Sequence, residues 1–448
     1  MANRYWTGAV NGGTGTWDTS NTANWSATSG GAGGASVPTS SDDVFFDANS
    51  GAGVCTLGAN VVFRIGNFTG YTGTVDFSTF KMSTAHNGTT ILNTGSTATL
   101  LGSKRIEFTY SGSTGSRDIT GLMPEANAPD IYVTAGSDTI SGGIRCRNLD
   151  FTGFSGKLTG AFQYVFGDLI MSPTMTTNSG TNQIIFASTN ATTRTITSNG
   201  VTFNFELHFD GVAGSWRLQD DLTLSSIRRV RSINGTFDAN NKNVTIGGYR
   251  TQAGTKTLNM GSGIWTVTGD NAGLGTATWN ANAAATGLTI IPGTSTITMT
   301  SANAKTFEGA GRTYNVLNQG GAGTLTITGA NTFANITNTV QPATITFPAS
   351  TTTTVSAFGV SGTSGNLITL NSSTSGTRAT LSDSSGVVSV SFCDIKDLNA
   401  TGGATWAAYI DNGNVDSGNN LNWDFGGTPT VTTELTYRLR SFTTPRRF

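Results

Sequence analysis

The sequence predicts an all-β protein whose main part is a β-solenoid with a cap at each end. The 448 residues include 59 Gly and 79 Thr but only 11 % charged residues, a composition that disfavours long helices. Short segments in which apolar and polar residues alternate recur along the chain between Gly, Asn and Ser turns, which is typical of strands. A short Gly-containing unit is also repeated, as expected for stacked coils.

Residues 1–50 are predicted to form an N-terminal cap rich in Trp and Gly. The segment contains three Trp and no long alternating run before residues 44–46. A solenoid has to cover its open ends against the addition of further strands, and bulky aromatic side chains can do so.

Residues 51–386 are predicted to form the solenoid itself. The strongest alternation covers residues 201–210 and places one set of side chains in the core and the other set outside, because neighbours on a strand point to opposite faces. The inward set is Val201, Phe203, Phe205, Leu207 and Phe209, and the outward set is Thr202, Asn204, Glu206 and His208.

The repeated unit favours a solenoid over other all-β folds. Residues 67–75 match residues 150–158, and weaker copies lie at 208–216 and 318–325. A turn Gly between two strands suits a corner that successive coils reuse. Coils of about 24 residues give roughly 14 coils, with stacked Thr and Asn rows on the outer face. Serial β-sandwich domains are the alternative, since they also contain irregular repeats and alternating strands.

The C-terminal part divides into two segments. Residues 387–427 are predicted to form the last coil and a C-terminal cap, and residues 428–448 form an Arg-rich tail. Residues 430–439 alternate loosely, so we expect the tail to add as an extended segment to another subunit, with its arginines on carboxylates or carbonyls. The predicted subunit-interaction residues are Tyr437, Arg438, Arg440, Arg446 and Arg447.

Charge and cysteine content argue against several classes of protein. The net charge is −1, which does not support whole-chain attraction to nucleic acid or to an acidic membrane. Cys55, Cys146 and Cys393 are too few and too widely spaced to suggest a disulfide framework or a zinc site. His86 and His208 lack metal-binding spacing, and His208 is expected to be solvent-exposed. We expect no cofactor, no signal peptide and no membrane span.

The carboxylates do not predict a catalytic site. Glycosidic cleavage needs two carboxyl groups about 5–9.5 Å apart. The adjacent pairs are Asp42–Asp43 and Asp220–Asp221, and neighbouring side chains on a strand point to opposite faces. Asp394 and Asp397 are also on opposite faces of a regular strand, which leaves carboxylates from different coils as the open alternative. Arg229 and Arg231 share a face, which we interpret as solvated, although it could dock an acidic neighbour.

The two ends of the chain resemble known proteins. Residues 4–8 (RYWTG), 15–18 (GTWD), 24–26 (NWS) and 37–47 (VPTSSDDVFFD) resemble the opening of bacteriophage virion β-helix proteins and of some autotransporter-like adhesins. Residues 392–425 resemble the last coil and cap of right-handed parallel β-helices in these groups. The resemblance implies a right-handed parallel β-helix and a multi-copy virion part: a tail fibre or spike, a tail adaptor or a capsid decoration.

We therefore expect a non-enzymatic structural component of a bacteriophage virion, assembled in the host cytoplasm. The partners implied by the resemblance are other virion proteins and further copies of the chain, with a homotrimer favoured. A host cell-surface glycan is a further candidate partner. Two alternatives remain open: a polysaccharide-degrading enzyme of the tailspike kind, and a secreted bacterial surface adhesin.

Overall fold

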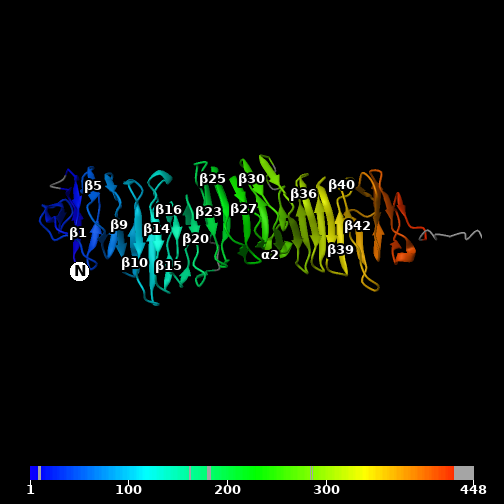
Figure 1. Ribbon diagram of the computed structural model, residues 1–448, viewed down its shortest axis with the longest axis horizontal. Helices are drawn as coiled ribbons and strands as arrows, with labels where there is room; N and C mark the ends of the chain where they lie inside the picture. Colours follow the sequence, from blue (N-terminus) through cyan, green and yellow to red (C-terminus); the bar gives the residue numbers. More distant parts are fainter. Residues whose placement is uncertain (9–11, 161–162, 179–182, 283, 285, 428–448) are drawn as a thin grey trace, which may run out of the picture.

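The chain forms one elongated rod of stacked coils, with the N-terminus at one end and the last described coil at the other (Figure 1). The computed structural model describes residues 1–8, 12–160, 163–178, 183–282, 284 and 286–427. The rod is nearly all β, with about 17 turns of parallel strands. The estimate of roughly 14 coils is too low, because coils begin at the first strand and many are shorter than 24 residues; Asp394, for example, lies beside Val415 of the next coil.

Each coil passes over three faces, and the strands of one face form a ladder along the rod. One face begins with β1 (Asn3–Trp6), β3 (Trp25–Ser26), β4 (Asp43–Phe45), β7 (Ile65–Asn67), β10 (Gly88–Asn93), β13 (Ser116–Thr120), β15 (Thr139–Ser141), β18 (Lys157–Leu158) and β21 (Thr176–Thr177). A second face contains β2 (Gly15–Trp17), β5 (Val54–Leu57), β8 (Thr74–Asp76) and β11 (Thr99–Leu101).

The longest sheet extends over most of the rod and covers two of the faces, because the strand at residues 229–238 pairs with one strand of the next coil through residues 229–232 and with the following strand through residues 235–238. Its first strands are β6 (Val61–Val62), β9 (Lys81–Thr84), β12 (Arg105–Phe108), β14 (Asp130–Val133), β16 (Arg145–Cys146), β17 (Leu149–Asp150), β19 (Gln163–Val165), β20 (Leu169–Ile170), β22 (Gln183–Phe186), β23 (Thr193–Thr197), β25 (Glu206–Leu218) and β27 (Arg229–Asp238). It continues through β29 (Gly248–Thr251), β30 (Lys256–Asn259), β32 (Trp279–Asn280), β33 (Leu288–Ile291), β35 (Lys305–Glu308), β37 (Thr324–Thr328), β39 (Ala343–Phe347), β42 (Ile368–Ser372), β45 (Cys393–Lys396) and β48 (Val415–Asp416).

Two further ladders complete the C-terminal half. One contains β24 (Thr202–Phe203), β26 (Leu222–Leu224), β28 (Val244–Ile246), β31 (Ile264–Val267), β34 (Thr296–Met299), β36 (Thr313–Gln319), β38 (Thr332–Asn338), β40 (Thr352–Val355), β41 (Phe358–Gly359), β43 (Ala379–Ser382) and β46 (Leu398–Thr401), and the other contains β44 (Val387–Ser389), β47 (Thr405–Ala407) and β49 (Trp423–Asp424). Short helices η1 (Thr22–Asn24), η2 (Glu125–Asn127), α2 (Asn271–Leu274) and η3 (Ile410–Asn412) lie between strands.

The strand pairing confirms the predicted β-solenoid. Strands pair in parallel with the strand one coil further on, and this continues from β4 and β7 near the N-terminus to β45 and β48 near the C-terminus. Separate β-sandwich domains would interrupt these ladders, so the alternative of serial sandwiches is wrong. The ladder also stacks Thr side chains on the outer face, as in the column of Thr202, Thr223, Thr245, Thr266 and Thr298.

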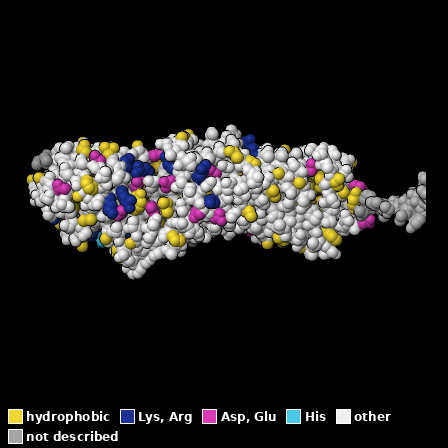
Figure 2. Space-filling model, viewed as in Figure 1, with side chains coloured by type: hydrophobic (Ala, Val, Ile, Leu, Met, Phe, Trp, Pro, Cys, Tyr) yellow, Lys and Arg dark blue, Asp and Glu magenta, His cyan; other side chains and the backbone are white. Residues whose placement is uncertain are grey.

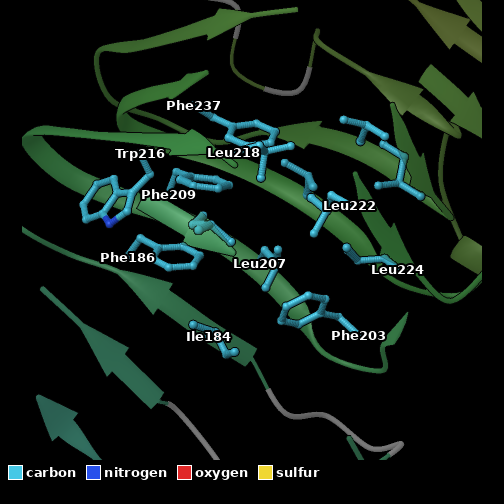
Figure 3. Close-up of a cluster of buried hydrophobic side chains, with 14 of the residues drawn as sticks. Ile184, Phe186, Phe203, Leu207, Phe209, Trp216, Leu218, Leu222, Leu224 and Phe237 are labelled. Atoms are coloured by element: carbon cyan, nitrogen blue, oxygen red, sulfur yellow. The ribbon is translucent and has the colours of Figure 1, made fainter. Parts of the chain in front are cut away.

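The core consists of side chains stacked in the same register. Leu207, Val230, Tyr249, Trp279 and Phe307 form one such column, in which each residue pairs with the next along the ladder. The inward set predicted for residues 201–210 is confirmed, because all five of its side chains are buried. Figure 3 shows Phe203, Leu207 and Phe209 packed with neighbours from adjacent coils.

His208 corrects one expectation about the outward set. Thr202 is exposed and Asn204 and Glu206 are half-buried, but His208 is only 8 % exposed. Its ring nitrogen Nε2 lies 3.2 Å from a carboxylate oxygen of Glu206, and the ladder places Arg231 beside it. Coils stack about 4.8 Å apart, so long polar side chains on the outer face cover one another. Alternation alone therefore assigns the face but not the exposure.

Aromatic clusters lie at both ends of the rod. The indole rings of Trp6 and Trp25 are 5.3 Å apart, those of Trp17 and Trp25 are 5.0 Å apart, and Phe46 packs against all three. Strand β3 pairs antiparallel with β1 and so covers the first edge of the ladder. At the other end the rings of Trp406 and Trp423 are 5.0 Å apart.

The repeated unit forms a corner at its two strongest copies. Residues 67–75 join β7 to β8, and residues 150–158 join β17 to β18. In both copies a Gly with positive φ, at +82° in Gly70 and +94° in Gly153, makes the turn. The weaker copy at residues 208–216 lies inside the continuous strand β25 instead.

Lys305 is an inward-pointing cation that links stability to pH. Its side chain is fully buried at the start of β35, and Nζ donates hydrogen bonds to the carbonyl oxygens of Ser301 (2.8 Å) and Gly323 (3.0 Å). Burial lowers the pKa of Lys305 to about 8. The ordinary value is about 10.4, so between these values the unfolded chain binds more protons than the folded chain.

We therefore expect Lys305 to make the free energy of unfolding rise with pH between about pH 8 and about pH 10. The difference in urea unfolding between the natural chain and Lys305→Met, measured across this range, isolates its contribution. A variant that keeps the same pH slope would contradict the assignment.

Candidate functional site

A loop that bridges several coils defines the most distinctive surface feature of the rod. Helix η2 lies in the loop between β13 and β14, and its Glu125 carboxylate accepts hydrogen bonds from the Thr189 N–H and the Thr189 hydroxyl, both at 2.8 Å, and from the Ser188 hydroxyl. Strand β14 pairs with β17, β17 pairs with β20 and β20 pairs with β23, so this contact crosses three coils. The loop therefore spans about 14 Å along the rod.

A hollow of about 540 Å³ lies beside this loop, and we call it the bridged hollow. Its wall combines apolar, hydrogen-bonding and cationic side chains taken from successive coils. The lining residues are Lys104, Pro124, Glu125, Ala126, Arg147, Phe166, Thr189, Asn190 and Arg194. Because these residues lie on coils that follow one another along the ladder, the bridged hollow suits an elongated ligand that lies along the rod.

The cations of the bridged hollow are held in place by neighbouring groups. Lys104 donates from Nζ to the Ala126 carbonyl oxygen at 2.6 Å, and burial together with the nearby charge of Arg147 lowers the pKa of Lys104. Arg147 donates from Nε to the Asp130 carboxylate at 2.7 Å, and this hydrogen bond raises the pKa of Arg147. The Arg147 side chain remains 43 % exposed, so it is accessible to a ligand.

Arg194 and Glu125 form the other charged edge of the bridged hollow. A guanidinium nitrogen of Arg194 lies 3.7 Å from a Glu125 carboxylate oxygen. Burial alone would raise the pKa of Glu125, but the hydrogen bonds from Ser188 and Thr189 and the charge of Arg194 outweigh this effect and lower the pKa. Glu125 therefore stays ionised and fixes the loop, while the wall still presents more positive than negative charge.

The wall of the bridged hollow offers three kinds of contact to a ligand. Pro124 supplies exposed apolar surface beside the largely buried Phe166, Thr189 and Asn190 supply hydrogen-bonding groups, and Lys104 and Arg147 supply cations that suit a carboxylate. On the face visible in Figure 2, Lys and Arg side chains gather in the N-terminal and central parts of the rod.

The aspartates that form sequence pairs accept hydrogen bonds from neighbouring residues or form ion pairs with them. Asp42 accepts hydrogen bonds from the Thr39 backbone and hydroxyl, while Asp43 pairs with Arg64. The other four carboxylates also accept hydrogen bonds. Asp220 accepts them from the backbone N–H groups of Ser198 and Asn199, and Asp221 accepts one from the N–H of Asn243. Asp394 accepts one from the Ser417 hydroxyl, and Asp397 accepts one from the Asn419 side-chain amide.

The basic stretch at β27 faces a carboxylate of its own chain. Arg231 Nε lies 2.7 Å and Arg229 Nη1 lies 3.5 Å from the Glu206 carboxylate of the preceding coil. Burial alone would raise the pKa of Glu206, but the hydrogen bond from His208 and the charge of Arg231 outweigh it, so the pKa is lowered. Arg229 is only 8 % exposed, so the interpretation of a solvated face is wrong for this residue.

The predicted subunit-interaction residues lie outside the described residues. This applies to Tyr437, Arg438, Arg440, Arg446 and Arg447, which belong to residues 428–448. In the part of the chain that the structure describes, no cluster of three or more His, Cys, Asp or Glu side chains could hold a metal ion, and no helix is long and apolar enough to cross a membrane. Cys55, Cys146 and Cys393 are buried free thiols.

No protein family, no curated protein and no solved structure matches this chain.

Proposed function

We propose that the protein is a non-enzymatic structural component of a bacteriophage virion, a fibre- or spike-like rod that also contacts the host surface. The observation that carries this proposal is the uninterrupted β-solenoid of about 17 turns, a fold compatible with phage tail fibre and spike proteins. Continuous parallel ladders make the rod a stiff spacer about 80 Å long, at about 4.8 Å per coil. The resemblance of the two chain ends to virion β-helix proteins supports the same role.

The proposed contacts are with other virion proteins, with further copies of the chain in a homo-oligomer such as a trimer, and with a glycan of the host cell surface. The bridged hollow is the proposed glycan site, and its excess of positive charge favours a saccharide that carries carboxylates. Rim charges of this kind also accelerate encounter with an acidic surface.

The bridged hollow predicts a measurable preference for acidic saccharides. A tetrasaccharide of galacturonic acid is the probe, and calorimetric titration of the full chain should detect binding that a neutral galactose tetrasaccharide does not show. Lys104→Gln is expected to weaken this binding about tenfold, which corresponds to about 1.4 kcal/mol. The binding should also weaken as salt rises, because salt screens exposed charges.

Lys157→Gln is the matched control, since this exposed lysine lies on a different ladder, in β18. Equal binding of the acidic and neutral probes, or equal loss of binding in both variants, would contradict the glycan site.

A separate assay tests the non-enzymatic part of the proposal. The protein is incubated with the same saccharides and with the host polysaccharide, and new reducing ends and unsaturated products are measured. We expect none, and turnover that a single Asp→Asn change abolishes would overturn the non-enzymatic part of the proposal.

A further inference from the structure

The C-terminal end of the described rod differs from the N-terminal end in how its strand edges are covered. At the N-terminal end β3 pairs antiparallel with β1. At the C-terminal end β48 pairs with β45 and β49 pairs with β47, and Leu421 forms a bridge to Asn399. Among the described residues no strand pairs with the outer edges of β48 and β49. Such edges present unpaired N–H and C=O groups to which another strand can add.

This end, which we call the acidic end, combines exposed apolar side chains with negative charge. Ile410 is 59 %, Val415 is 43 % and Leu421 is 46 % exposed. Residues 392–427 contain five Asp and a single Lys, with Asp416 and Asp424 exposed on the last two strands. Figure 2 shows Asp and Glu side chains at this end of the rod.

The sequence that follows has complementary chemistry. Residues 428–448 contain four Arg and one Glu, so their net charge is +3. Val431, Leu435, Tyr437 and Leu439 give the segment apolar side chains that an extended strand can present to one side. The 21 residues can reach about 70 Å when extended, far enough to contact a neighbouring rod.

We infer that the acidic end is a docking surface for residues 428–448 of a second copy of this chain. The tail adds as a strand to the open edge of β48 or β49, its apolar side chains cover Val415 and Leu421, and its arginines contact Asp416 and Asp424. This inference deepens the proposed function and rests on its oligomeric role.

The sequence also favours exchange between copies over a further coil within one chain. Gly426, Gly427 and Pro429 follow β49 in the sequence, and because Pro has no N–H to donate to a ladder, this composition disfavours a further coil. In parallel rods of one oligomer, each end can offer one tail and receive one tail, so the contacts form a closed, symmetric set.

Charge reversal of the full chain tests the inference. One variant carries Asp416→Arg and Asp424→Arg, and the other carries Arg438→Asp and Arg440→Asp. We expect each variant alone to associate at least tenfold more weakly than the natural chain in sedimentation velocity, because like charges then meet. Mixing the two should restore oligomers that contain both variants, because each tail then finds an end of opposite charge.

The control variant carries Asp76→Arg and Asp150→Arg. Each of these carboxylates accepts a hydrogen bond from the backbone N–H of the residue two positions later, as the carboxylates of Asp416 and Asp424 also do. This control should associate like the natural chain. Any one of three results would overturn the inference: the natural chain is monomeric, both charge-reversed variants associate as the natural chain does, or both variants are weakened and their mixture stays monomeric. Rescue on mixing also proves that both variants fold. The saccharide titration is independent of this result, so failure here leaves the proposed glycan site standing.

Discussion

Replacing Arg117 with Met is expected to lower the free energy of unfolding by about 3–5 kcal/mol. Arg117 points into the core from β13, and both it and Asp138 have side chains that are 0 % exposed. The guanidinium binds the two carboxylate oxygens at 2.6 and 3.0 Å and the Ala135 carbonyl oxygen at 2.9 Å. Its removal leaves a buried carboxylate without a cation.

The effect should be local as well as large, because the strands pair with those of adjacent coils and the bridging loop at Glu125 reaches only three coils further, to Thr189. Hydrogen exchange should accelerate in the coils around β13 and β15 and stay unchanged around β42. Arg217→Met is the matched control, since Arg217 pairs with Asp238 but is 50 % exposed, and it should cost less than about 1 kcal/mol. Equal losses of unfolding free energy in the two variants would contradict the account. The double variant Arg117→Met with Asp138→Leu should regain part of the lost stability, because it leaves no buried charge without a partner.

Replacing Phe209 with Ala is expected to cost about 3–5 kcal/mol, because the large cavity cannot collapse inside stacked coils. Phe209 is 1 % exposed, and its ring lies 5.0 Å from that of Phe186 and 4.4 Å from that of Phe237. Figure 3 shows these rings together with Trp216, and urea unfolding followed by circular dichroism measures the loss of stability.

Val212→Ala provides the control for Phe209→Ala on the same strand. Val212 is 69 % exposed, so its truncation should change the free energy of unfolding by less than about 0.5 kcal/mol. If Phe209→Ala were as mild as this control, the inward orientation of the alternating set in β25 would be wrong.

The fold was predictable because its main determinant is local. Alternation at residues 201–209 assigns the inward side chains without knowledge of distant residues, and Gly70 and Gly153 mark corners through a backbone conformation that favours Gly. Exposure was less predictable, since His208 and Arg229 are covered by residues of neighbouring coils. Which residues meet there depends on coil lengths, and these vary along the chain.

The bridged hollow was not predictable from the sequence for the same reason. Lys104, Arg147 and Arg194 lie on different coils, and no spacing rule connects them. The loop that defines the hollow is held by contacts of Glu125 with Ser188 and Thr189, which are more than sixty residues away. A Glu in a short loop gives no sequence signal for such a partner. The inward Arg117 was likewise hidden, because a charged residue in an alternating run reads as an outward position.

The central claim is that this rod is a structural part of a phage particle, and the most direct test is to locate the chain in purified particles. Mass spectrometry of the particles, combined with a low-resolution density map of particles labelled at this chain, provides that location. The account predicts several copies per particle, visible as rods about 80 Å long, at about 4.8 Å for each of about 17 coils. Recovery of the chain with the bacterial cell envelope, and its absence from purified particles, would contradict the claim.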